Sequence, residues 1–164
     1  SVKEVTTPLG IANCSVPTNK LVLSTILRAG LPLHNGFLNY FDNAQNAFVA
    51  AYRKYGKDNK FTIQIEYVSS PKLDGKTLVI ADPMLATGSS LVLAYEKLCT
   101  LGEPEHTHIV CPIASKDSLA YLSKHLPHKK VTLWVAAVDE ELTNKSYIVP
   151  GIGDAGDLAF GEKL

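Results

Sequence analysis

The chain has 164 residues, 46% of them hydrophobic, and its 16 basic residues balance its 16 acidic residues. That length and apolar content support one domain with a real hydrophobic core. The balanced charge argues against a nucleic-acid footprint and against attraction to an anionic membrane, and no apolar run is long enough to span a bilayer. Three widely spaced cysteines are typical of reduced core residues in a cytoplasmic protein.

The first part of the sequence predicts a hairpin followed by a strand, a loop and a helix. Residues 2–16 alternate loosely around a turn at 8–10 and predict a β-hairpin, and residues 21–27 form an apolar strand pattern. Arg28 then opens a short loop before a helix that has Pro32 in its first turn. An arginine there can contact two phosphate oxygens, although a surface arginine on a tight turn explains one such residue more simply.

Two more strand patterns flank a basic loop. Residues 47–52 and 61–68 alternate in the manner of strands and are expected to pair as a hairpin. The polar, basic residues 53–60 between them, beginning with Arg53, are predicted to form a mobile loop. Such a loop can close over an anionic substrate and exclude water; a solvated hairpin tip is the alternative.

The central motif of the sequence runs from Leu78 to Ser90. An apolar strand pattern ends at Asp82 and Pro83, a small hydroxyl-rich loop follows, and a helix pattern then runs to Gly102, its expected C′ residue. Unpaired N–H groups and the positive end of the helix dipole favour a phosphate at this loop. Asp82 is placed to accept hydrogen bonds from two sugar hydroxyls. A plain helix N-cap after a strand-ending acid remains the alternative.

The remaining elements complete an α/β pattern. Residues 106–114 and 131–138 are apolar strands, and residues 115–126 predict an amphipathic helix between them. Strands that alternate with helices predict a mostly parallel sheet flanked by helices on both faces, in a single domain over residues 1–164. Ligands in such sheets bind at the carboxyl ends of strands, and this end carries four charged residues: Arg28, Arg53, Asp82 and Asp139.

The C-terminal stretch from Tyr147 to Asp157 contains three glycines and a proline. These residues favour a winding backbone that exposes N–H and C=O groups. A planar ring with alternating acceptors and an N–H, such as a pyrimidine, can be recognised by such a backbone. A loop packed for structural reasons is the alternative.

Together these motifs resemble the uracil phosphoribosyltransferases. The resemblance depends on residues 26–30, on Tyr52-Arg53, on residues 82–88, and on residues 147–157 followed by Phe160-Gly161. It implies a type I phosphoribosyltransferase fold with a β-hairpin arm and a C-terminal base-binding segment. The family's chains also carry N-terminal helices that this sequence lacks. The implied reaction converts uracil and 5-phosphoribosyl 1-diphosphate (PRPP) to UMP and diphosphate, in pyrimidine salvage.

The resemblance also implies roles for individual residues. The residues expected to hold the ribose 5-phosphate and its hydroxyls are Asp82, Pro83, Met84, Leu85, Ala86, Thr87, Gly88, Ser89 and Ser90. Arg28 and Arg53 would meet the diphosphate, and Asp154 would face it as well. The uracil would be surrounded by Ile148, Gly153, Asp154 and Ala155. Arg53, Asp82 and Asp154 are the implied catalytic residues, with Mg²⁺ carried by the diphosphate and no direct protein ligand.

The expected partners are therefore uracil and PRPP, with GTP as a possible effector and a homodimer or higher homo-oligomer as the assembly. Neither a membrane nor a nucleic acid is expected as a partner. The alternative is a non-catalytic nucleotide-sensing or RNA-binding regulator on the same fold, which would require a local basic face despite the balanced total charge.

Overall fold

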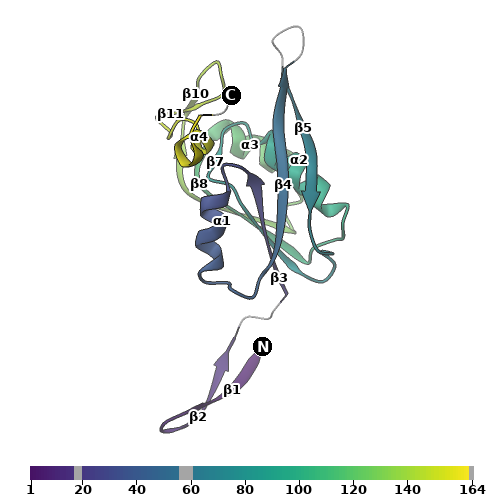
Figure 1. Cartoon of the computed structure of the whole chain (residues 1–164), viewed down its shortest axis with the longest axis vertical. Helices are drawn as coiled ribbons and strands as arrows, with labels where there is room; N and C mark the ends of the chain where they lie inside the picture. The colour runs from purple at the N-terminus through teal and green to yellow at the C-terminus, as the bar shows by residue number, and fades with distance from the viewer. Residues whose placement is uncertain (17–19, 56–60, 163–164) are drawn as a thin grey trace.

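The computed structural model describes residues 1–16, 20–55 and 61–162. A hairpin of β1 (Val2–Thr7) and β2 (Gly10–Ser15) lies at one end, apart from the main body (Figure 1). Its place in the sequence is the one predicted. In the part of the chain that is described, no helix is long and apolar enough to cross a membrane.

The main body is built around one large sheet. Its strands lie in the order β5 (Phe61–Ser69), β4 (Gln45–Tyr55), β3 (Leu21–Leu27), β6 (Thr77–Ala81), β8 (His106–Ser115) and β9 (Val131–Asp139). The short β7 (Met84–Leu85) follows β6 and pairs with the last residues of β8. Neighbouring strands are parallel except for β4 and β5, which form an antiparallel pair. The predicted α/β fold with a mostly parallel sheet is confirmed.

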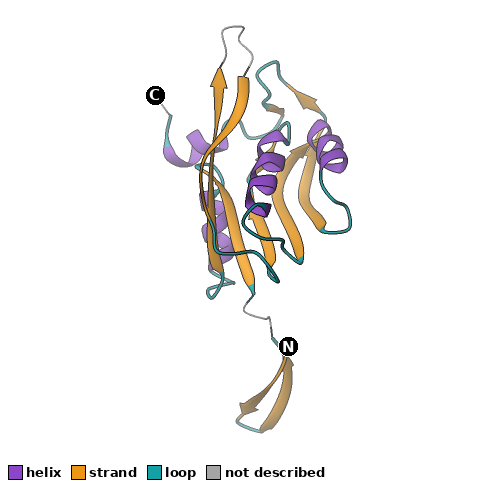
Figure 2. Ribbon diagram, turned by 90° about the vertical axis from the view of Figure 1, so that its right-hand side faces the viewer, coloured by secondary structure: helices purple, strands orange, loops and turns teal. Residues whose placement is uncertain are grey.

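Helices lie on both faces of this sheet. The helices α2 (Ser89–Cys99) and α3 (Lys116–His125) lie on one face, and α1 (Leu31–Leu38) lies on the other (Figures 1 and 2). The main core forms beneath α2 and α3 from fully buried side chains, among them Val22, Leu78, Ile80, Leu91, Leu98 and Ile109. The buried His34 holds α1 against β4, because its ring lies 2.7 Å from the amide oxygen of Asn46.

Burial is less complete on the α1 side of the outer strands. Because α1 packs on β3, it leaves β9 uncovered, and Trp134 of β9 is 56% exposed. The sequence prediction of helices over both faces therefore holds for the centre of the sheet and not for this edge. An apolar strand pattern cannot distinguish a central strand from a partly exposed edge strand, which accounts for the difference.

Two predicted boundaries were wrong. Residues 53–55 were expected in a loop, but they continue β4 and pair with residues 61–63 of β5, because a two-stranded antiparallel arm tolerates polar side chains as long as its backbone groups are paired. The remainder of the predicted loop, residues 56–60, lies outside the described residues. The helix α2 ends at Cys99 rather than just before Gly102. Gly102 instead allows a close approach to the turn at Leu73-Asp74, where an added Cβ would lie 2.8 Å from the Leu73 nitrogen.

The chain ends in a small C-terminal unit. The strands β10 (Glu141–Leu142) and β11 (Ile148–Val149) form an antiparallel pair, and α4 (Ala155–Phe160) follows. This unit lies near the carboxyl ends of the parallel strands (Figure 1), and its helix α4 contacts the loop after β3, where Arg28 pairs with Asp157. The fold thus brings the C-terminal motif to the same end of the sheet as the central motif.

Candidate active site

The loop between β6 and α2 is shaped by a glycine at the start of the helix. Gly88 is the N-cap of α2 and has a φ of 76°, a conformation that favours glycine. A Cβ added there would lie 2.3 Å from Leu122 Cδ1 and 3.3 Å from the Ser118 carbonyl oxygen. Backbone conformation and close packing against α3 therefore both require glycine at this point.

The start of α2 has the features of an anion site. Gly88 provides no side-chain cap, and the Ser89 N–H makes only a long hydrogen bond to Thr87 Oγ1, at 3.4 Å, so most donors of this first turn are left for a ligand or solvent. The Thr87 and Ser89 hydroxyl oxygens lie 2.7 Å apart, so one of these hydroxyls donates to the other at the start of the helix. These donors, together with the helix dipole, make the loop a cradle suited to a phosphate.

Ser115 stabilises the cradle through a hydrogen bond. From the sequence alone, this serine is interpreted only as the start of a helix. The buried Ser115 hydroxyl donates to the Ala86 carbonyl oxygen at 2.5 Å and accepts from the Ser118 N–H at 2.9 Å. Ser115 thereby caps α3 and ties that helix to the phosphate loop at the same time. A serine before a helix predicts the cap, but nothing local to it predicts a bond to a loop 29 residues away.

Asp82 stands at the start of this loop in a desolvated position. Its N–H donates to the Val110 carbonyl oxygen at 3.1 Å, which fixes the residue beside β8. Burial raises the pKa of its carboxyl group from 3.8 to about 7, and a hydrogen bond from the Met84 backbone N–H opposes part of that rise. The carboxyl group is therefore poised to ionise near neutral pH, which is typical of a functional site.

A buried thiol lies close to this carboxyl group. Burial raises the pKa of Cys111 to about 12, and the nearby Asp82 raises it as well. The Cys111 thiol donates to the Ile113 carbonyl oxygen at 2.9 Å. Cys111 is thus a neutral packing residue beneath the site, with no nucleophilic role.

The side chain of Arg28 extends from the loop after β3 to the C-terminal helix α4. Its guanidinium group contacts Asp157 Oδ1 at 3.2 Å and the Gly161 carbonyl oxygen at 3.3 Å, and its Cζ atom lies 6.0 Å from the centre of the Phe160 ring. Asp157 was not among the predicted site residues. Its position in the first turn of α4 gives only the ordinary signal of an acid near a helix N-terminus.

Close packing joins the β3 loop to both other loops. A Cβ added at Gly30 would lie 2.8 Å from the Ala81 carbonyl oxygen, next to Asp82. A Cβ added at Gly156 would lie 3.8 Å from the Ala29 side chain. The loop that carries Arg28 therefore lies between the phosphate cradle and the start of α4.

The C-terminal segment is fixed at both of its ends. Ile148 is buried in β11 at 4% exposure, and Asp154 is the N-cap of α4, where its Oδ1 atom accepts from the Asp157 N–H at 2.9 Å. Between them the Gly151 N–H donates to Asp139 Oδ2 at 3.1 Å. Gly153 has a φ of 76°, which a glycine adopts without strain.

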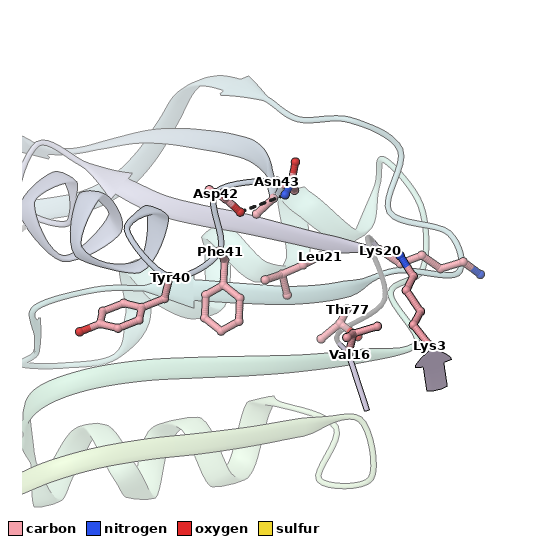
Figure 3. A pocket seen from close by; sticks show the side chains of 10 residues that line it. Lys3, Val16, Lys20, Leu21, Tyr40, Phe41, Asp42, Asn43 and Thr77 are labelled. Atoms are coloured by element: carbon pink, nitrogen blue, oxygen red, sulfur yellow. Dashed lines mark hydrogen bonds between the residues drawn. The ribbon is translucent and has the colours of Figure 1, made fainter. Parts of the chain in front are cut away.

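The structure thus brings three of the four predicted groups together: the cradle at residues 82–90, Arg28, and the segment at residues 148–155. Arg53 is placed on β4, where its backbone pairs with Ile63. The structure describes the backbone of Arg53 but not its side chain. Among the described residues, a cavity of about 530 Å³ lies at the other end of the sheet, between the N-terminal hairpin and the turn after α1 (Figure 3). It contains none of the predicted site residues.

A mostly parallel sheet flanked by helices, with the small loop after β6 entering α2 at Gly88, is the type I phosphoribosyltransferase fold. The fold supports this class, since the structure of a purine phosphoribosyltransferase from Pyrococcus horikoshii superposes with a TM-score of 0.54, covering 76% of this chain and 80% of that one at 17% identity. A structure of the AQ2163 protein from Aquifex aeolicus superposes with a TM-score of 0.86 at 34% identity, covering 98% of this chain and 75% of that chain.

Sequence comparison identifies the family. The family model for uracil phosphoribosyltransferase matches residues 1–162. A uracil phosphoribosyltransferase from Porphyromonas gingivalis is 59% identical over 163 residues, which are 99% of this chain and 75% of that protein. One from Methanothermobacter thermautotrophicus is 40% identical over 160 residues, 96% of this chain and 72% of that protein. The chain belongs to the uracil phosphoribosyltransferase family, whose members are pentosyltransferases.

Proposed function

We propose that the chain transfers the phosphoribosyl group of PRPP to uracil at the surface formed by the three loops. The observation that supports this assignment of residues is the cradle at the start of α2, where Gly88 provides no side-chain cap and the first N–H groups of the helix lie beside the Thr87 and Ser89 hydroxyls. In this proposal residues 82–90 hold the 5-phosphate and the ribose. Asp82, once ionised, accepts hydrogen bonds from the two ribose hydroxyls.

The arginines act on the leaving group. As the glycosidic C–O bond breaks, positive charge grows on the ribose and negative charge grows on the departing diphosphate. Preorganised cations placed against the diphosphate stabilise that charge without any covalent nucleophile. We assign this role to Arg28 and Arg53. Arg28 lies at the junction of the three loops, while Arg53 is carried on the two-stranded arm formed by β4 and β5.

Magnesium fits this site as an ion carried by the substrate. The described residues contain no cluster of three or more acidic, histidine or cysteine side chains that could hold a metal, so most ligands of such an ion would come from the diphosphate oxygens and water, as Mg²⁺ commonly accepts. When bound, Mg²⁺ would neutralise part of the charge on the leaving diphosphate. Asp154 is the carboxylate that we expect to face the sugar diphosphate.

The segment from Ile148 to Ala155 is proposed to bind uracil. Its backbone N–H and C=O groups would pair with the two carbonyl groups and the N3–H of the ring. Cytosine presents an amino group and an unprotonated N3 instead, which would leave buried partners unmatched. A site that requires such hydrogen bonds can discriminate by up to about 10⁴–10⁵.

The direct test is UMP formation from uracil and PRPP with Mg²⁺, with cytosine and orotate assayed in parallel. We expect turnover with uracil alone. Arg53→Ala is expected to lower turnover by about 10²–10³, the usual effect of one transition-state donor, and to change the KM for uracil much less. Normal turnover with a raised KM for uracil would refute the role of Arg53. Absence of turnover together with salt-sensitive RNA binding would favour a regulator instead.

The assembly, its effector and its location are further parts of the proposal. We expect a homodimer or larger homo-oligomer in the cytoplasm, with GTP as the effector to test. Light scattering coupled to gel filtration measures the first, and UMP formation with and without GTP measures the second. A monomer that is fully active and insensitive to GTP would refute both.

A further inference from the structure

The last residue of β9 is an acid that reaches across to the C-terminal segment. Asp139 pairs with Ser115 at the end of the parallel β8–β9 ladder, so its backbone belongs to the rigid sheet. Its Oδ2 atom accepts a hydrogen bond from the Gly151 N–H at 3.1 Å. A side chain anchored in the sheet therefore holds a backbone group of the segment 12 residues further along the chain.

The bond falls in the middle of a stretch with little other support. Within the described part of the chain, it is the one hydrogen bond made by the backbone of residues 150–153. Gly151 has a φ of 49°, and a Cβ added to it would lie 2.4 Å from the Ile148 carbonyl oxygen. The neighbouring Ile152 is 41% exposed, so apolar packing holds the stretch only weakly. Its position therefore depends strongly on Asp139.

We propose that Asp139 is a positioning residue for base recognition. The inference depends on the proposed function, in which residues 148–155 bind the uracil ring. Recognition by backbone groups requires that these groups be fixed, and a displacement of about 1 Å can reduce a rate by about 10²-fold. A carboxylate that accepts from a backbone N–H makes one of the stronger kinds of hydrogen bond. Asp139 thus sets where the base lies without touching it.

The adjacent Glu140 provides a matched control. It carries the same charge one residue further on, but its carboxylate pairs with Lys116 Nζ at 2.5 Å and its side chain is 74% exposed. Replacing Glu140 removes one negative charge from the same region and leaves the Gly151 contact intact. A purely electrostatic influence on the site would therefore appear in both variants.

The experiment compares two ligands by titration calorimetry. UMP occupies the cradle and the base segment, whereas ribose 5-phosphate occupies the cradle alone. For Asp139→Ala we expect the Kd for UMP to rise by about 10–100-fold, as for the loss of one charge-assisted hydrogen bond, while the Kd for ribose 5-phosphate changes less than about threefold. Asp139→Asn keeps an acceptor oxygen at the same position without the charge, so it is expected to weaken UMP binding much less than Asp139→Ala does. Glu140→Ala is expected to change neither constant.

Steady-state kinetics give a second readout, in which Asp139→Ala raises the KM for uracil and leaves the KM for PRPP unchanged. If the alanine variant does not fold, Asp139→Glu replaces it. Its longer side chain displaces the acceptor, so it should weaken UMP binding more than the asparagine variant does.

Three results would overturn the inference: unchanged UMP affinity in Asp139→Ala, equal weakening of both ligands, or an asparagine variant as impaired as the alanine variant. Equal affinity of the wild type for UMP and ribose 5-phosphate would refute the base-site assignment itself, and this role of Asp139 with it.

Discussion

Replacing Asp82 with asparagine is expected to stabilise the ligand-free protein at alkaline pH. Burial raises the pKa of the Asp82 carboxyl group from 3.8 to about 7, so the folded protein holds a proton that the unfolded chain has already released. Stability must then fall as the pH rises from 3.8 to about 7 and stay nearly level above that range. This dependence is opposite in sign to that of a salt-bridged aspartate.

The size of the effect follows from the shift. A rise of about three pKa units corresponds to about 4 kcal/mol at 1.36 kcal/mol per unit. Part of this cost is already present at pH 5, because the unfolded carboxyl group is largely ionised there. Between pH 5 and pH 8 the free energy of unfolding should therefore decrease by about 2.5 kcal/mol through Asp82 alone. Asparagine has nearly the same shape and does not ionise, so this contribution disappears in the variant.

Urea unfolding of the wild type and of Asp82→Asn at pH 5 and pH 8, without ligand, measures the difference. The variant should gain about 2.5 kcal/mol relative to the wild type between the two pH values, and histidine titration cancels in the comparison. Glu140→Gln, at an exposed carboxylate, should show no such gain. A constant difference between wild type and Asp82→Asn at both pH values would refute the raised pKa. The asparagine variant should also lose affinity for ribose 5-phosphate, since it carries no charge to accept from the ribose hydroxyls.

The remaining predictions concern the neighbouring loops. Gly88→Ala should destabilise the protein by at least about 1–2 kcal/mol, because an L-residue is strained at a φ of 76°, and should abolish ribose 5-phosphate binding by calorimetry; normal binding would contradict the cradle. Ser115→Ala should cost about 1–3 kcal/mol in urea unfolding through the lost cap and the unpaired Ala86 carbonyl, with Ser115→Thr restoring most of it. Asp157→Asn should change stability by less than about 1 kcal/mol, since its pair with Arg28 is partly exposed. Its affinity for free diphosphate should increase severalfold, because a competing negative charge is removed; weaker binding would show that Asp157 orients Arg28 instead.

Local patterns predicted much of the fold. The strand at residues 21–27 and the start of α3 near Ser115 are signalled by short-range features: an apolar run bounded by polar residues, and a serine before an amphipathic repeat. The cradle was predictable for the same reason, since a strand, a small loop and a helix are contiguous in the sequence. The wrong boundaries, at residues 53–55 and at Gly102, both lie where partners distant in the sequence decide the local structure. Pairing with residues 61–63 keeps residues 53–55 in β4. Close packing against the turn at Leu73-Asp74 explains why glycine is present at position 102.

The residues of the candidate site also fall into those that a local sequence pattern predicts and those that it does not. Arg28 and Asp82 were predictable because each follows an apolar strand at the ligand-binding end of a parallel sheet. The residues that hold the loops were not predictable. Asp139 was noted only for its place at a strand end, while Ser115 and Asp157 appeared to be ordinary helix-start residues. Their significance lies in bonds to segments 12, 29 and 129 residues away, which no local pattern encodes.

These supporting residues also explain how one sheet sets the distance between two substrate subsites. Ser115 and Asp139 are register partners at the end of the parallel β8–β9 ladder, where neighbouring strands lie about 4.8 Å apart. Ser115 holds the phosphate loop through Ala86, and Asp139 holds the C-terminal segment through Gly151. The spacing between the proposed phosphate and base subsites is therefore set by two side-chain hydrogen bonds whose residues lie side by side on neighbouring strands. A reaction that needs no covalent nucleophile depends on holding its two substrates in line, and the ends of two hydrogen-bonded strands provide that rigidity more reliably than the loops themselves.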